Sequence, residues 1–129
     1  MNREIMPSTI APPASNYAHA VLSEGAGTLL HLSGVVGVRP DGTIPDDLAD
    51  QASVVWSNIA AILTEAEMAM TDIVSITTYV VVDFMDGLPE VMAARNHALG
   101  GQRVASTLVT VPALARPAWK MEIAVVAAR

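Results

Sequence analysis

The chain has 129 residues, which is enough for one domain with a single hydrophobic core. Its formal net charge is −6, and its seven basic residues are scattered singly, so no basic stripe is available to bind nucleic acid. There is no cysteine, which excludes disulfides, thiolate nucleophiles and cysteine-ligated metals.

Apolar residues make up 52% of the chain and charged residues only 16%. No uninterrupted apolar run approaches the ~18 residues that cross a bilayer, and the first residues lack the apolar core of a signal peptide. We therefore expect a cytoplasmic protein without a membrane partner. The surplus apolar surface is expected to pack against another subunit.

The first part of the chain predicts extended structure. Residues 1–15 are rich in Pro and Ala and are expected to be extended. Residues 17–22 and 28–32 are predicted to pair as a hairpin that turns at residues 24–27.

Two helices and a strand follow in the middle of the chain. The first helix is predicted to start near residues 45–47, where acidic residues favour the helix dipole. Its apolar stripe recurs at steps of three and four and comprises Ala52, Val55, Trp56, Ile59, Leu63 and Ala66. Residues 73–82 are β-branched and predict a strand, and residues 88–99 predict a second helix that ends before two glycines.

The last quarter of the chain predicts two strands joined by a loop that contains proline. The second strand, near residues 119–126, places Met121 and Ile123 on one face and Glu122 on the other. A carboxylate inside an apolar strand has to be solvated, paired or used in chemistry, because burying it unpaired costs several kcal/mol (roughly).

The order β-β-α-β-α-β-β predicts one α+β domain over residues 1–129, with a mixed sheet and both helices on one face. No segment is left over to cover the other face of the sheet. A second subunit is the economical way to cover it, so we expect an oligomer.

Most well-known catalytic motifs are absent. The three histidines, His19, His31 and His97, do not have metal-ligand spacing, so no metal site is predicted. The glycines near residue 25 belong to a turn, not to a phosphate-binding loop, and no Ser/His/Asp arrangement has motif support.

Short segments along the chain nevertheless match one family in order and spacing. They are Tyr17-Ala-His-Ala-Val, Leu32-Ser33-Gly34, Gln51-Ala52, the run from Asp72 to Val80, Ala105-Ser106-Thr107 and Lys120-Met-Glu122-Ile. In these segments the chain resembles the Rid family (reactive intermediate deaminases, also called YjgF-type or endoribonuclease L-PSP proteins).

The resemblance implies a chorismate-mutase-like fold that forms a homotrimer with clefts between neighbouring subunits. It also implies hydrolysis of small enamines or imines to a ketone or keto acid and ammonia, without a cofactor. By motif, Glu122 is expected to position water, while Tyr17, Ser33, Gly34 and Thr107 shape the substrate cleft.

One position departs from the family pattern. The family motif Pro-Ala-Arg-Ser/Thr aligns with residues 103–106, which puts Ala105 where the family has a substrate-gripping arginine. A methyl group cannot replace a bidentate guanidinium. Arg103 lies two residues away, on the same face of an extended strand and about 6–7 Å from Ala105. Arg103 is either a substitute clamp or a solvated loop residue.

Three functions remain open at this point. The first is imine or enamine hydrolysis on a substrate that is anchored differently from the family pattern. The second is a non-catalytic small-molecule binder or regulator, and the third is another reaction at an activated C=N or C=C bond. The acidic composition does not support RNA cleavage, and the sequence does not identify the substrate.

Overall fold

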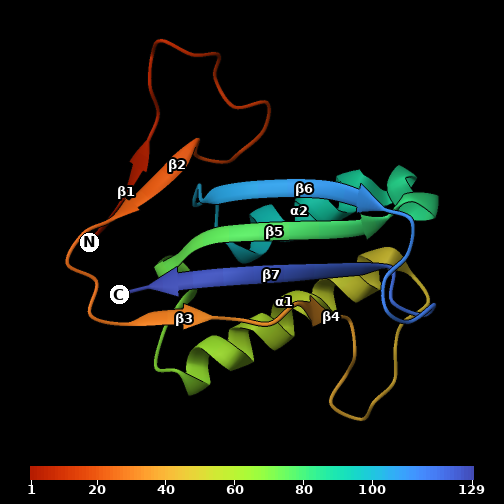
Figure 1. Cartoon of the computed structure of the whole chain (residues 1–129). Coiled ribbons are helices and arrows are strands. Elements are labelled where there is room, and N and C mark those ends of the chain that lie inside the picture. Colours follow the sequence, from red (N-terminus) through yellow and green to blue (C-terminus); the bar gives the residue numbers. More distant parts are fainter.

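A computed structural model describes all 129 residues and consists of one main sheet, two helices and an N-terminal arm (Figure 1). The strands of the main sheet are β3 (Leu29–His31), β4 (Val35–Val36), β5 (Ile73–Val81), β6 (Ala105–Val111) and β7 (Met121–Ala128). The helices are α1 (Leu48–Glu65) and α2 (Leu88–Ala98), and short 3₁₀ turns (Met70–Asp72 and Val82–Gly87) flank β5.

The main sheet is mixed, as predicted. Its strand order is β3-β7-β5-β6, and β4 also pairs with β7. β5 and β6 run parallel, whereas β7 is antiparallel to β5, β3 and β4. Both helices lie behind the sheet in Figure 1, and no segment of the chain lies in front of it. The predicted α+β class and the placement of both helices on one face are confirmed.

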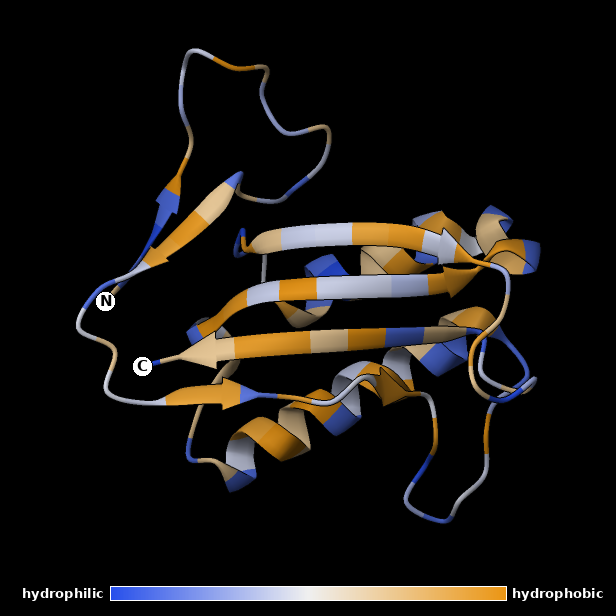
Figure 2. Cartoon of the chain, viewed as in Figure 1, coloured by the Kyte–Doolittle hydropathy of each residue, from blue (hydrophilic) through white to orange (hydrophobic).

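The alternation predicted for the last strand is also present. Met121, Ile123 and Val125 of β7 are at most 2% exposed, while Glu122 and Ala124 between them are only half-buried. The buried set packs with the apolar stripe of α1 in one core. In Figure 2, β7 is mostly orange, with paler bands and a blue band near its start, and α1 below it is banded in orange and blue. β7 is therefore held by burial on the helix side and leaves its other side available.

The predicted hairpin between residues 17–22 and 28–32 is wrong. β2 (Ala20–Ser23) pairs with β1 (Asn2–Ile5) in a separate two-stranded arm, a pairing that the sequence analysis did not predict. After the arm, the amides of Gly27 and Thr28 donate to the carbonyl of Arg129, so β3 begins beside the end of β7. Both strands were expected, but the pattern of alternation does not specify which strands pair.

The face of the sheet opposite the helices carries hydroxyl, small and apolar side chains. We call it the open face. It comprises Ser75, Thr77 and Tyr79 of β5, Ala105, Thr107 and Val109 of β6, and Glu122, Ala124 and Val126 of β7, which match in register. All nine are half-buried or exposed, so this face lacks the cover that the helix side has.

Gln51 ties α1 to the loop that leads into β7. It is fully buried, and its Nε2 donates to the carbonyls of Pro45 (2.8 Å) and Ala118 (2.9 Å). Its Oε1 accepts the amide of Lys120 at 3.0 Å. A Cβ at Gly37 would lie 2.9 Å from the Cβ of Gln51, so the backbone after β4 also packs directly on this helix. These contacts hold the backbone at Lys120, directly before β7 begins and two residues before Glu122.

We predict that Gln51→Ala lowers the free energy of unfolding by about 3 kcal/mol, because a fully buried side chain is truncated and three buried or part-buried backbone groups lose their partner. Urea unfolding followed by circular dichroism measures this change. Ser53→Ala in the same helix is the control, since Ser53 is exposed and bonds only to the carbonyl of Ala49. Equal stabilities for the two variants would contradict this role of Gln51.

Candidate functional site

Glu122 is an unpaired carboxylate on the open face. It is the second residue of β7 and stands in register with Tyr79 on one side and Val36 on the other. The chain has two ion pairs, Arg3–Glu24 and Arg103–Glu4, and Glu122 belongs to neither. No side-chain hydrogen bond involves it. Of the three options for a carboxylate in this strand, pairing within the chain is therefore excluded, and solvation or chemistry remains.

Gly34 lies directly against the Glu122 side chain. A Cβ built on Gly34 would be 2.0 Å from Oε1 of Glu122 and 2.5 Å from its Cδ, far inside contact distance. Only glycine at this position lets the carboxylate lie against the backbone between β3 and β4. Ser33, the neighbouring predicted site residue, is exposed on the same segment. The structure thus brings one part of the predicted site together at the β4 edge of β7.

A second group of predicted residues gathers at the other edge of the sheet. Ala105 begins β6 and forms a bridge with Ala18, whose amide donates to the carbonyl of Val104 at 2.9 Å. Tyr17 therefore lies beside the start of β6. Its hydroxyl accepts the amide of Ala14 at 3.3 Å, and its ring meets the ring of His19 edge-on, with centroids 6.5 Å apart.

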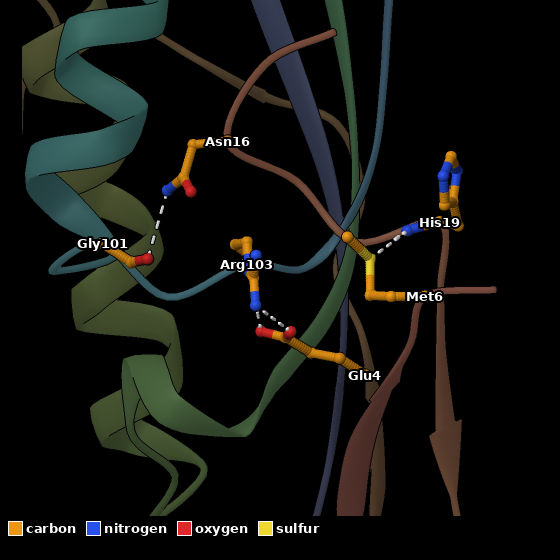
Figure 3. A network of polar contacts seen from close by, with 6 residues as sticks. All are labelled: Glu4, Met6, Asn16, His19, Gly101 and Arg103. Atoms are coloured by element: carbon orange, nitrogen blue, oxygen red, sulfur yellow. Dashed lines mark hydrogen bonds and ion pairs between the residues drawn. The ribbon is translucent and has the colours of Figure 1, made fainter. Parts of the chain in front are cut away.

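Arg103 lies at this edge as well, and its guanidinium is engaged by the arm (Figure 3). Nη2 donates to Oε2 of Glu4 at 2.7 Å and Nε to Oε1 at 3.3 Å, while the Arg103 side chain stays 45% exposed. The same view shows Asn16 bound to the carbonyl of Gly101 at 3.1 Å. Arg103 is thus a partly exposed ion-pair residue in this structure, and binding a substrate there would require it to release Glu4.

The two groups are far apart within one chain. Ala105 is level with Ser75 and Val126, whereas Glu122 is level with Tyr79 four residues further along β5. Four residues correspond to about 13 Å along the strands, and two strand spacings add about 10 Å across them. Thr107 lies between, level with Thr77. A small substrate cannot contact Ala105 and Glu122 of the same subunit at once.

A pocket of about 420 Å³ lies at the Glu122 end of the sheet. It is lined by Val81 at the end of β5, by Phe84, and by the loop before β7, including Leu114 and Arg116. The guanidinium carbon of Arg116 is 5.6 Å from the ring centre of Trp119, a cation–π contact. The sequence analysis did not single out this loop, because its spacing carries no motif. No group of three or more His, Cys, Asp or Glu side chains lies close enough to hold a metal ion.

The sequence analysis also missed Arg95 in α2, which is only 5% exposed. Burial lowers the pKa of its guanidinium, although an arginine stays protonated at neutral pH. A signal for it exists in the sequence: Arg95 is four residues after Val91 and four before Leu99, both buried, so it falls on the apolar stripe of α2.

Comparisons with known proteins agree on one family. The model of the family described as "Endoribonuclease L-PSP" matches residues 8–129. The chain belongs to this family, the Rid or YjgF family. The crystal structure of the Rid protein YyfB from Yersinia pestis is 30% identical, has a TM-score of 0.89, and covers 99% of this chain and 98% of its own. Rv2704 from Mycobacterium tuberculosis, of the YjgF/YER057c/UK114 family, shares the fold, with 24% identity, a TM-score of 0.70 and full coverage of both chains.

Among curated proteins, a RutC family protein of Aquifex aeolicus is 32% identical over 79 residues, which are 60% of this chain and 61% of that protein. Another from Leuconostoc mesenteroides is 35% identical over 77 residues, 57% of each chain. The match thus spans about three fifths of these Rid relatives. None of the helices in this Rid chain has the length and apolar character needed to span a membrane.

We predict that Gly34→Ala moves the Glu122 carboxylate while leaving the fold intact. The atoms in the way are the end of a flexible side chain, so the free energy of unfolding should change by less than about 1 kcal/mol. A crystal structure of the variant measures the displacement. Gly27→Ala is the matched control, because a Cβ there meets nothing within 4 Å. An unmoved Glu122 in Gly34→Ala would contradict the predicted contact.

Proposed function

We propose that this Rid protein is a cytoplasmic, cofactor-independent hydrolase of small imines or enamines, acting in clefts between the subunits of a homotrimer. The observation that carries the proposal is the unpaired carboxylate of Glu122, on an open sheet face and held against Gly34. Membership of the Rid family supports it. The family description mentions an endoribonuclease, but a net charge of −6 offers no basic surface for RNA.

The proposed reaction needs one well-placed carboxylate. Water adds to the imine carbon while Glu122 accepts a proton from it. That proton passes to the nitrogen and gives a carbinolamine. Transfer of the carbinolamine's hydroxyl proton to the nitrogen, also through Glu122, then lets the C–N bond break, and ammonia leaves as the C=O bond forms. Overall, one imine and one water give one carbonyl compound and one ammonia. General base assistance of this kind contributes about 10²–10⁴-fold in rate.

The separation of the two residue groups supports a cleft shared between subunits. Glu122, Ser33 and Gly34 lie toward the β3–β4 side of the sheet, and Tyr17, Ala105 and Arg103 lie at the β6 edge. In a closed oligomer, one edge of a subunit can face the opposite edge of its neighbour. Each cleft then receives Glu122 from one subunit, and Tyr17 and Thr107 from the next.

We predict that Glu122→Ala lowers the hydrolysis rate at least tenfold and leaves the oligomer intact. The substrate is an imine released in situ by an amino-acid-consuming enzyme, and the readout is the rate of imine loss. Glu65→Ala, an exposed glutamate at the end of α1, is the control. An unchanged rate in Glu122→Ala would assign Glu122 to structure.

A wild-type protein that binds these compounds without turnover would favour a non-catalytic binder or regulator. Ala105 favours this second candidate, because the position lacks the guanidinium that grips a substrate carboxylate in the family pattern. If the protein binds imines without converting them but does convert another compound with an activated C=N or C=C bond, the third function is favoured.

We also predict a homotrimer, with a mass in light scattering three times the 13.5 kDa of one chain. Val109→Lys should reduce this mass, because it places a charge on the apolar part of the open face. Ile62→Lys is a matched control, since both side chains are 39% exposed but Ile62 lies on α1. A wild-type monomer at micromolar concentration would overturn the trimer.

A further inference from the structure

Arg95 is a buried cation without an acidic partner. It is only 5% exposed, and the other two buried polar residues, Gln51 and Thr78, are uncharged. Both ion pairs of the chain involve other arginines, so no carboxylate lies within 4.0 Å of Arg95. Arginines are almost never fully buried unless they are paired with an acid.

The hydrogen bonds of Arg95 all go to neutral acceptors. Nε and Nη2 donate to Oδ1 of Asn96 at 3.1 and 3.0 Å. Nη2 also reaches Oγ of Ser15 at 3.3 Å, and Nη1 reaches Oγ of Ser106 at 3.4 Å. The two hydroxyl contacts are at the long end of the hydrogen-bond range. The guanidinium is therefore solvated by the protein but not neutralised.

This arrangement costs free energy that an apolar residue would avoid. A buried charge without a counter-charge carries a desolvation penalty, only part of which neutral hydrogen bonds offset. A methionine at this position would fill the same space without that penalty. An anion that enters the site would remove the penalty by supplying the missing charge.

The guanidinium lies between the edge strand of the sheet and the segment that joins β1 to β2. Ser106 is on the helix side of β6, the edge strand of the sheet, and Ser15 belongs to the irregular segment between β1 and β2. That segment is fastened beside Arg95 by the bond from Asn16 to the carbonyl of Gly101 and by the amide of Ala18. Since Ser106 points away from the open face, this place is separate from Glu122.

We propose that Arg95, Ser15 and Ser106 form a binding site for one small monocarboxylate. The two carboxylate oxygens pair with Nη1 and Nη2 of Arg95 in the bidentate geometry that guanidinium favours. The serine hydroxyls, released from accepting these N–H groups, turn and donate to the same oxygens. A single negative charge neutralises the single positive charge. Inorganic phosphate would bring an excess negative charge into the same buried space, so a monocarboxylate fits better.

The test compares the wild type, Arg95→Met and Arg103→Met by thermal unfolding in sodium acetate and in sodium chloride of equal ionic strength. Acetate should raise the Tm of the wild type saturably, by about 5 °C at roughly ten times its Kd. Arg95→Met should lose this rise. Arg103→Met should keep it, because Arg103 is a partly exposed arginine at the same sheet edge and is paired with Glu4.

A second measurement does not depend on the stability of a variant. The Nε–Hε signal of Arg95 in a ¹⁵N spectrum should shift as acetate is added to the wild type. Arg95→Lys keeps the charge but loses the planar guanidinium with its two parallel N–H donors. This variant should therefore bind acetate at least tenfold more weakly. Glu122→Ala should bind acetate as the wild type does, which keeps this result independent of any hydrolytic activity.

Four outcomes would overturn the proposal. They are a wild type that responds to acetate no more than to chloride, an Arg95→Met variant that keeps the acetate response, tighter binding of inorganic phosphate than of acetate, and a change of oligomeric mass in Arg95→Met. The last would mean that a carboxylate of a neighbouring subunit, not a free ligand, is the partner of Arg95.

Discussion

The pairing of β7 on both of its edges is the constraint on which the rest of this structure depends. β5 flanks it along one edge, and β3 and β4 flank it along the other. With both edges occupied, alternate residues of β7 are directed to the helices or to the open face. Met121 and Ile123 are at most 1% exposed. A slip of one residue would put Glu122 into this core, so core packing enforces the position of the carboxylate.

The same register separates Glu122 from Ala105. Both belong to the open face, but they lie two strands apart across the sheet and four residues apart along the strands. A rigid sheet cannot bend to bring them together, since β5 lies between β6 and β7 and pairs with both. A cleft that contains both has to be built from two surfaces. The proposed oligomer therefore places the open face of each subunit at a contact with its neighbour.

The sequence predicted the elements of this fold better than their pairing. Hydrophobic period identified α1 and the alternation of β7, because burial on one side sets that period. β-branched composition identified β5, and a pair of glycines marked the end of α2. It did not predict that β2 pairs with β1, because a short strand of mixed polarity fits several partners equally well. The family resemblance supplied the site residues around Glu122. The close contact of Gly34 with that carboxylate needed coordinates, since sequence gives no side-chain direction across an edge.

Arg95 illustrates a different limit of sequence reasoning. An arginine between buried positions of a helix is ordinarily expected to extend its charge to solvent. Here the guanidinium ends among Asn96, Ser15 and Ser106, and Ser15 is 80 residues away in the chain. Glu122 and Arg95 are thus a carboxylate and a guanidinium on opposite sides of one sheet, and neither has a partner of opposite charge. Because Ser106 and Glu122 point to opposite faces, the two charges cannot neutralise each other within a subunit. In the two proposals, each charge meets a group from outside the chain: an imine and its water at Glu122, and a monocarboxylate at Arg95.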